Sequence, residues 1–363
     1  MTDTSAEDLD LALLPVTPNL SPSSYYATTA RPFQGIPGIE RASGGRLWAT
    51  WYAGGDNEGP LNYVLLVTSG DDGATWPDPV LVVDPPANIR AFDPVVWHDP
   101  QGRLWLFWAQ GVSHWDGRGG VWAIHTNDSN SASPAWSAPE RIADGVMMNK
   151  PTVLSNGEWL LPVAIWGHQP IVHPAVDPAN RTPHVVASGD QGRTWQLRGG
   201  PSMENRSYDE HMVVERKDGS LWMLTRLHDG IGESVSTDGG LTWTAGRKSN
   251  ITHIDSRFFI RSTRSGQILL VKHHNNTGRS HLTAFLSSDD GATWQGGLVI
   301  DERADVSYPD GVEYDGNKFL VIYDRERYAA RDILLARFTA DDVLAGKIVA
   351  PASTLKQLVN RAS

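Results

Sequence analysis

Five ionisable residues stand at the start of otherwise apolar runs and could together form a polar substrate pocket. They are Asp93 in FDPVVW, Lys150 in NKPTVL, Glu210 in DEHMVV, Arg257 in SRFFIR and Asp310 in YPDGVE, while a sixth run, GIPGIE, has Ile36 at this place. Carboxylates can transfer protons and cations can bind anionic groups. The alternative is a network of ion pairs, which the mixed signs allow. A network does not explain why the charges gather at one end of each run, so we favour a substrate pocket.

The runs that carry these residues belong to a repeat. A Gly-containing turn followed by a short apolar run occurs six times, as GGRLWATWYAG, QGRLWLFWAQG, NGEWLLPVAIWG, DGSLWMLTRL, SGQILLVKHH and GNKFLVIYD. Each run is rich in β-formers, too short for a helix and bounded by turn residues, which indicates a strand. Small sheets cannot bury both faces alone and must stack. We therefore predict an all-β fold, a six-bladed β-propeller with four-stranded antiparallel blades.

A second repeated phrase, Ser-x-Asp-x-Gly-x-Thr-Trp, begins at residues 69, 188, 236 and 287, and HTNDSNSASPAW is a stretched fifth copy. Its Asp can accept backbone N–H groups of its own turn, its Gly can adopt a positive φ, and its Trp can pack between sheets. We expect the phrase to close a hairpin at the edge of each blade and to take no part in catalysis.

Composition narrows the class of protein. The 363 residues include no cysteine, carry a net charge of −11 and begin with an acidic segment that does not resemble a secretory signal. We expect a cytoplasmic protein without nucleic-acid or membrane partners. The propeller is predicted over residues 21–350, with 1–20 as a candidate outer closing strand and 351–363 as a C-terminal tail. The sequence does not indicate an oligomeric state.

The repeated phrase is an Asp-box, and the chain resembles the sialidase (neuraminidase) superfamily over nearly its whole length. GIPGIERASGGRLWATWYAGGDNEGP is similar to the family's first inner strand and following loop, which implies that Asp56 is the general acid/base. YDEHMVVERKDGSLWMLTR resembles the segment with a catalytic Glu and a substrate-binding Arg, here Glu210 and Arg226. TGRSHLTAFLSSDDGATW implies a further substrate Arg at Arg279, and VSYPDGVE implies a nucleophile at Tyr308.

The chemistry implied by this resemblance is a retaining exo-glycosidase acting on a terminal acidic sugar. A phenol has a pKa near 10 and needs a base to become a nucleophile, and Glu210 would be that base. Sialidases use Tyr where most retaining glycosidases use a carboxylate. The neutral phenol avoids repulsion from the substrate carboxylate, which Arg226 and Arg279 would bind through bidentate hydrogen bonds.

One position departs from the family pattern. The family has a third Arg in its first motif, and this chain has Gly35 there. Losing a charge-assisted donor pair costs about 1.5–3 kcal/mol. Either Arg257 or Lys150 supplies the missing charge from a neighbouring blade, which we favour, or the pocket accepts a different sugar, acidic or neutral.

His211 offers an alternative chemistry, because a His beside a carboxylate could serve a lyase or a rhamnosidase-like propeller enzyme together with Tyr308. KHHNNTGRSH adds Lys272 and further histidines. We favour the interpretation that His211 packs between blades and that the others lie on a loop. A non-catalytic glycan-binding propeller is the third alternative. No metal-binding spacing such as His-Glu-x-x-His is present, so we predict neither a metal nor another cofactor.

Overall fold

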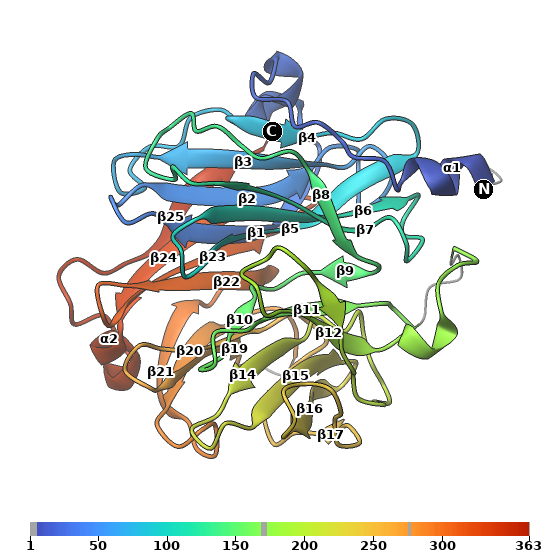
Figure 1. Cartoon of the computed structure of the whole chain (residues 1–363). Helices are drawn as coiled ribbons and strands as arrows, with labels where there is room; N and C mark the ends of the chain where they lie inside the picture. The colour runs from blue at the N-terminus through green and yellow to red at the C-terminus, as the bar shows by residue number, and fades with distance from the viewer. Residues whose placement is uncertain (1–5, 168–172, 275–276, 363) are drawn as a thin grey trace.

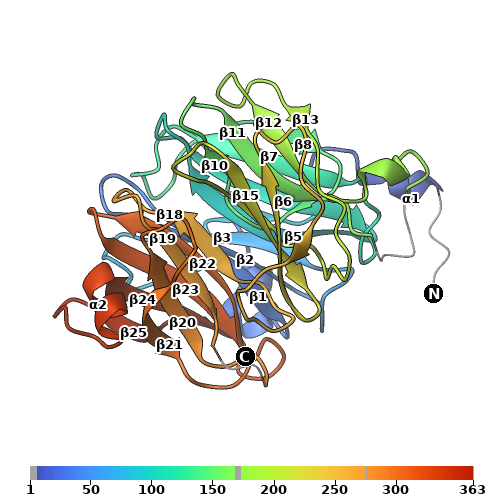
Figure 2. The same cartoon turned by 90° about the horizontal axis from the view of Figure 1, so that it is seen from below.

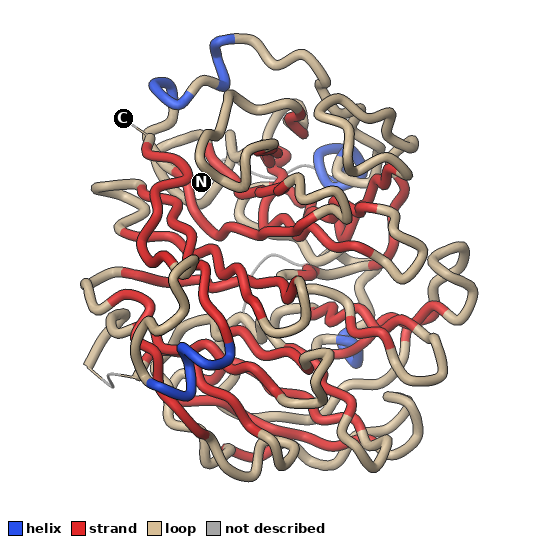
Figure 3. Tube along the Cα trace, turned by 90° about the vertical axis from the view of Figure 1, so that its left-hand side faces the viewer, coloured by secondary structure: helices blue, strands red, loops and turns tan. Residues whose placement is uncertain are grey.

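The computed structural model describes residues 6–167, 173–274 and 277–362, and it arranges them as six antiparallel sheets around an axis (Figure 1). Seen from below, the first sheet lies beside the last, and β1 packs against β22 and β23 (Figure 2). Strands make up most of the regular secondary structure, and loops join them (Figure 3). The predicted all-β class and the six-bladed propeller are confirmed.

The first three blades run from the axis outwards in chain order. Blade 1 contains β1 (Gln34–Arg41), β2 (Leu47–Ala53), β3 (Tyr63–Ser69) and β4 (Leu81–Val83). Blade 2 contains β5 (Ile89–His98), β6 (Leu104–Val112), β7 (Gly120–Thr126) and β8 (Glu140–Ala143). Blade 3 contains β9 (Val146–Met147), β10 (Thr152–Val153), β11 (Trp159–Ala164), β12 (Pro183–Ser188) and β13 (Gln196–Leu197). In blade 3 the inner strand is interrupted, so both β9 and β10 pair with β11.

The last three blades repeat the same order. Blade 4 contains β14 (Met212–Glu215), β15 (Leu221–Leu227), β16 (Gly230–Ser236) and β17 (Arg247–Lys248). Blade 5 contains β18 (Phe259–Ser262), β19 (Ile268–His273), β20 (Leu282–Ser287) and β21 (Gln295–Asp301). Blade 6 contains β22 (Val306–Tyr314), β23 (Lys318–Arg325), β24 (Asp332–Thr339) and β25 (Thr354–Arg361). The helical segments are α1 (Ala6–Leu11), η1 (Ser24–Tyr26), η2 (Thr28–Ala30), η3 (Pro178–Asn180) and α2 (Ala340–Ala345).

The second strand of each blade forms the core between neighbouring sheets. All residues of β2, β6, β11, β15 and β19 are buried, as are the six central residues of β23. Both faces of such a strand are covered by other blades, which is why the sequence shows unbroken apolar runs rather than alternation. These second strands therefore form a buried apolar layer outside the inner strands.

The repeated Asp-box phrase joins the third strand to the fourth in blades 1, 3, 4 and 5. In blade 1, the Asp71 carboxylate accepts hydrogen bonds from the hydroxyl groups of Ser69 and Thr75, each at 2.6 Å. The Gly73 N–H donates to Ser69 Oγ at 2.9 Å. The other three copies repeat these bonds. The phrase closes hairpins, and none of its residues lines the axial pocket described below.

Blade 6 is closed by the C-terminal segment, because β25 pairs with β24 as its fourth strand. The propeller therefore extends beyond residue 350, where the sequence analysis placed its end. The described N-terminal residues form α1 and an isolated bridge between Asn19 and Val82 in blade 1, and they do not pair with blade 6. Only Val359 is buried in β25, so the alternation that would reveal this strand is weak.

Three inner strands contain a bulge at an X-Pro pair. The pairing register shifts at Ile36-Pro37 in β1, Asp93-Pro94 in β5 and Tyr308-Pro309 in β22. The residue before each proline has a positive φ, of 59°, 48° and 55° respectively. Such a backbone is costly for residues other than glycine; it occurs in several turns of this chain and is also enriched at functional sites. All three of these side chains line one pocket at the axis.

None of the helices in the described part of the chain is both long and apolar enough to cross a bilayer.

Candidate active site

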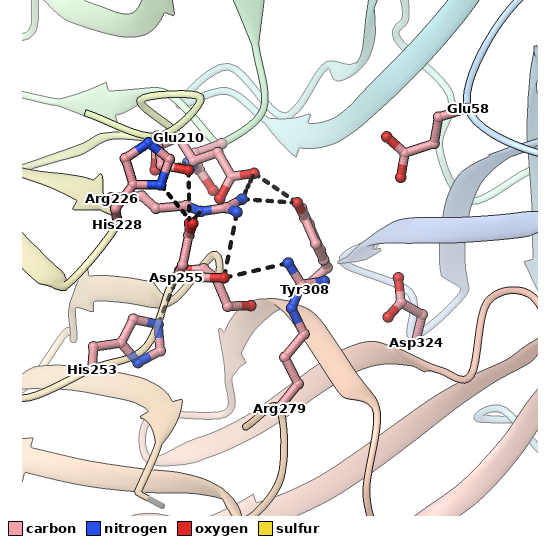
Figure 4. Close-up of polar contacts among 12 residues, drawn as sticks. Glu58, Glu210, Arg226, His228, His253, Asp255, Arg279, Tyr308 and Asp324 are labelled. Atoms are coloured by element: carbon pink, nitrogen blue, oxygen red, sulfur yellow. Dashed lines mark hydrogen bonds and ion pairs between the residues drawn. The ribbon is translucent and has the colours of Figure 1, made fainter. Parts of the chain in front are cut away.

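The phenol of Tyr308 and the carboxylate of Glu210 meet in a pocket at the propeller axis. Tyr308 Oη donates to Glu210 Oε1 at 2.8 Å (Figure 4). Arg226 Nη1 lies 2.7 Å from the same carboxylate oxygen and 3.1 Å from the phenol oxygen. Blades 6 and 4 thus bring together residues that are 98 positions apart in the chain. A phenol that is hydrogen-bonded to a carboxylate can react as a nucleophile when the carboxylate accepts its proton.

Burial determines the protonation of this pair. Burial, and after it the charge of Glu210, raises the pKa of the Tyr308 phenol above its ordinary value, while the nearby arginines act in the opposite direction. Tyr308 therefore holds its proton at neutral pH, and Glu210 is placed to accept that proton if the phenol reacts as a nucleophile. The backbone at Glu210 is held in place, because Asn149 Nδ2 donates to its carbonyl oxygen at 2.8 Å and its φ is 45°.

Arg226 is oriented by Asp255 on the side opposite Glu210. Arg226 Nε donates to Asp255 Oδ1 at 2.6 Å, and Asp255 also contacts Ser207 Oγ at 2.7 Å and His228 Nδ1 at 2.8 Å. Burial alone would raise the pKa of Asp255, but the charge of Arg226 and these hydrogen bonds hold it below its ordinary value. The ionised Asp255 fixes the plane of the guanidinium group.

Arg279 adds a second cation from the segment before β20. Its guanidinium carbon lies 5.4 Å from the centre of the Tyr308 ring, and its Nη2 lies 3.4 Å from the backbone oxygen of Asp255. Within the described residues, no carboxylate oxygen lies within 4.0 Å of the Arg279 guanidinium nitrogens. Its charge is therefore available to an anionic group in the pocket.

A third guanidinium group, which the sequence analysis missed, enters the pocket from the segment after β23. The Arg327 guanidinium carbon lies 4.6 Å from the centre of the Tyr308 ring. Its Nη1 donates to Glu58 Oε1 at 2.6 Å, and its Nε lies 3.6 Å from Asp324 Oδ2. Glu58 and Asp324 lie on the far side of Tyr308 from Glu210 (Figure 4). No sequence motif marks Arg327, because it belongs to a loop outside the repeat.

Asp93 lines the pocket and holds a proton at neutral pH. Its side chain is buried, and its Oδ1 has no hydrogen-bond partner among the described residues. Burial, although partly offset by Arg90, raises the pKa of Asp93 to about 8, and the charges of Glu58 and Glu210 add to the effect. A buried carboxylic acid in a pocket that also contains a nucleophile can act as a proton donor.

Asp56, the acid/base implied by the family resemblance, is exposed and does not line the pocket. It lies in the loop between β2 and β3, from which Glu58 reaches the pocket instead. Asn62 stabilises this loop by donating to the carbonyl oxygens of Gly54 at 2.5 Å and Asn57 at 2.9 Å. In this structure the loop therefore contributes Glu58, and not Asp56, to the site.

Three of the five ionisable residues predicted to line the pocket form a buried ion network along the axis instead. Lys150 Nζ lies 3.1 Å from both Glu40 Oε1 and Asp310 Oδ2, and Arg257 Nη2 lies 3.7 Å from Asp310 Oδ1. Lys150 and Arg257 therefore do not supply the charge missing at Gly35, which corrects the expectation from the sequence. The pocket receives only Asp93 and Glu210 from the predicted set.

His211 packs between blades. Its Nε2 lies 2.7 Å from the carbonyl oxygen of His184, it is buried, and it does not line the pocket. Burial lowers the pKa of His211 to about 3, so the ring is neutral at ordinary pH. No observation favours His211 as the acid or base of a lyase.

The pocket has a volume of about 190 Å³. Its apolar and aromatic lining includes Ile36, Met148, Trp166 and Tyr208. A wider groove of about 700 Å³ shares Arg279 with the pocket, so the two are neighbours. The described residues contain no group of three His, Cys, Asp or Glu side chains arranged to hold a metal ion.

The chain is similar to a known domain family and to several solved structures. The model of the BNR repeat-like domain family matches residues 45–321. No curated protein matches the chain. Among solved structures, a Hadza microbial sialidase is 18% identical with a TM-score of 0.67, and the match covers 86% of this chain and 66% of that one.

Two further structures are similar. The intramolecular trans-sialidase of Ruminococcus gnavus is 14% identical with a TM-score of 0.67, over 90% of this chain and 98% of that one. An α-L-arabinanase of Penicillium chrysogenum is 16% identical with a TM-score of 0.57, over 91% of this chain and 99% of that one. At these identities the similarity establishes the fold.

Proposed function

We propose that this chain, which belongs to the BNR repeat-like domain family, is a retaining exo-glycosidase that removes a terminal acidic sugar through a tyrosine nucleophile. The observation that carries the proposal is the hydrogen bond of 2.8 Å from Tyr308 to Glu210 beside the guanidinium of Arg226. Glycoside hydrolases among the similar structures, two of them named as sialidases, support the reaction class.

The reaction proceeds in two displacements. Glu210 accepts the Tyr308 proton while the phenol oxygen attacks the anomeric carbon, and the bond to the leaving oxygen breaks as an acid protonates that oxygen. The same acid, now ionised, then takes a proton from water, which attacks the anomeric carbon. Tyr308 leaves and recovers its proton from Glu210. Two inversions at one carbon give net retention.

We assign the proton donor to Asp93. The family resemblance implies Asp56, but Asp56 is exposed outside the pocket, and Glu58 is held in an ion pair with Arg327. Asp93 lines the pocket and retains its proton up to a pH of about 8. A general acid must be protonated at the working pH, and Asp93 meets this requirement.

The arginines favour a substrate with a carboxylate near its anomeric carbon. Arg279 has a charge that no carboxylate of the described chain neutralises within 4.0 Å, and Arg226 presents an oriented guanidinium beside it. A phenol nucleophile is neutral before attack, so it does not repel such a substrate as a carboxylate nucleophile would. The combination of Tyr308 with these cations therefore fits an acidic sugar.

The shape of the pocket favours cleavage at a chain end. Its volume of about 190 Å³ is below the range of about 300–1,000 Å³ found for drug-sized ligands, so it accommodates a single sugar. Lys150, Arg257 and Asp310 form a buried network on the inner strands and do not line the pocket. We infer that this network closes the inner end of the pocket, so that the leaving group extends outwards.

The test is a screen of fluorogenic glycosides of sialic acid, other ulosonic acids and uronic acids. We expect turnover of at least one acidic glycoside, with the first-formed anomer retained in the proton magnetic resonance spectrum. Tyr308→Phe should abolish turnover, whereas Tyr314→Phe on the same strand and outside the pocket should not. Binding of acidic sugars without turnover would instead support a glycan-binding propeller.

A further inference from the structure

We infer that Arg327 is the third cation of the anion-binding site and that Gly35 is the residue that admits it. Blade 6 thereby supplies a charge that the first inner strand lacks. The inference rests on the proposed function, because it names the residue that would recognise the carboxylate of the acidic sugar together with Arg226 and Arg279.

Space at Gly35 is the first observation. A Cβ atom built on Gly35 would lie 2.2 Å from Arg327 Cδ and 2.6 Å from Arg327 Cγ, distances that real Cβ atoms do not show. Gly35 does not have a positive φ, so its backbone does not require glycine. The glycine is needed because the stem of Arg327 passes over it. Any side chain at this position must displace Arg327.

The second observation is how Arg327 is held over the nucleophile. Its guanidinium lies 4.6 Å from the centre of the Tyr308 ring, and its side chain is 10% exposed. Asp324, 3.6 Å from Arg327 Nε, accepts the N–H of Ile36 at 2.8 Å and the hydroxyl of Ser307 at 2.7 Å. Asp324 thus ties the bulge of blade 1 to that of blade 6 and fixes the stem of Arg327 between them.

The alternative is that Arg327 is only a structural ion pair between Glu58 and Asp324. Glu58 lies on the loop after β2, and its side chain remains 29% exposed while it is 2.6 Å from Arg327 Nη1. A carboxylate that contacts Arg327 inside the pocket occupies a position where a substrate carboxylate could bind. We therefore regard Glu58 as occupying the position that the carboxylate of the substrate would take.

The test measures binding by calorimetry with two carboxylate probes, 2,3-unsaturated sialic acid and glucuronate, each paired with its methyl ester. We expect Arg327→Ala to weaken binding of a carboxylate probe by about 10- to 100-fold and to leave its ester unchanged, because the ester lacks the charge. Arg327→Lys should give an intermediate loss, since lysine retains the charge and not the planar pair of donors.

Gly35 variants separate the space argument from the charge argument. Gly35→Ala should reproduce most of the Arg327→Ala loss, because it displaces the Arg327 stem. Gly38→Ala on the same strand is the matched control, since its Cβ would meet its nearest neighbours at 3.4 Å, and it should bind as the wild type does. The double variant Gly35→Arg/Arg327→Gly should bind the carboxylate more tightly than either single variant, because it returns one guanidinium to the first strand.

The inference is overturned if the wild type binds neither carboxylate in preference to its ester, if Arg327→Ala retains that preference, or if Gly35→Ala behaves as Gly38→Ala does. Thermal unfolding of each variant verifies that it is folded. If Arg327→Ala does not fold, Arg327→Lys replaces it in the test. Carboxylate binding that depends on Arg327 without any turnover would uphold this inference and refute the proposed glycosidase. Turnover of acidic glycosides that does not depend on Arg327 would do the reverse.

Discussion

Replacing Glu210 by Gln removes the proposed base and preserves the shape of the side chain. Glu210 Oε1 accepts the Tyr308 hydroxyl at 2.8 Å and Arg226 Nη1 at 2.7 Å. An amide oxygen can still accept both bonds, but it cannot take the phenol proton. General base catalysis contributes about 10²–10⁴-fold, so we expect kcat to fall by that factor, which corresponds to about 2.7–5.4 kcal/mol of activation free energy.

The pH dependence distinguishes loss of the base from loss of structure. The charge of Glu210 raises the pKa of Tyr308, so its removal lowers that pKa and leaves the arginines to lower it further. The phenol of the Gln variant should ionise more readily as the pH rises, and its residual rate should rise with pH by up to about tenfold per unit. The wild type, in which Glu210 accepts the proton, should show no such rise.

The assay is steady-state hydrolysis of the best acidic fluorogenic glycoside between about pH 5 and pH 8. Glu215→Gln is the matched control, because Glu215 lies on β14 and contacts Ser155 outside the pocket. We expect that variant to keep the wild-type kcat. A Glu210→Gln enzyme within about tenfold of the wild type, or one whose rate does not rise with pH, would refute Glu210 as the base.

Three further predictions concern the acid and the scaffold. The wild-type rate should fall above about pH 8 as Asp93 loses its proton, and Asp93→Asn should abolish that fall. Asp93→Asn should retain most activity only on substrates with good leaving groups, whereas Asp56→Asn should change neither property. The opposite outcome in pH–rate profiles would return the acid role to Asp56. Hydrogen bonds from Thr194 hold the pKa of Asp190 at about 2, so the stability they provide is present above about pH 4 and is lost as the pH falls towards 2. The urea midpoint of Asp190→Asn should therefore fall less than that of the wild type over this range. An equal fall in both proteins would contradict the prediction. Gly192→Ala should destabilise the fold by about 1–3 kcal/mol in urea unfolding, because its φ is +81° and the new Cβ would lie 2.8 Å from the Trp159 ring, and an unchanged midpoint would show that the turn adapts.

The propeller could be predicted from the sequence because its strands and its hairpins are each specified by a short stretch of residues. The six apolar runs reveal strands buried on both faces, and the Asp-box reveals the hairpin by its own hydrogen bonds. The outer strand β25 escaped prediction because only Val359 is buried in it. An edge strand with few buried side chains shows no clear apolar pattern in the sequence.

The site was predicted in part, and the X-Pro bulges explain the errors. Aligning the inner strands on their Gly turns made Asp310 the equivalent of Asp93, whereas the bulges make Tyr308 its equivalent. An alignment on the prolines would have grouped Asp93 with Tyr308 and excluded Asp310, although it would still have included Lys150, which precedes Pro151 and belongs to the axial network. Arg327 could not be found in this way, because its place is set by the space over Gly35, a contact between distant loops.

The most direct test of the account identifies the residue that becomes glycosylated. The enzyme is inactivated with a fluorinated acidic sugar that carries a good leaving group, digested, and analysed by tandem mass spectrometry. We predict one sugar per chain, attached to the peptide that contains Tyr308 and located on its phenol oxygen. A sugar attached to Glu210 or Asp93, or steady turnover with an inverted anomer and no labelled peptide, would contradict the tyrosine mechanism.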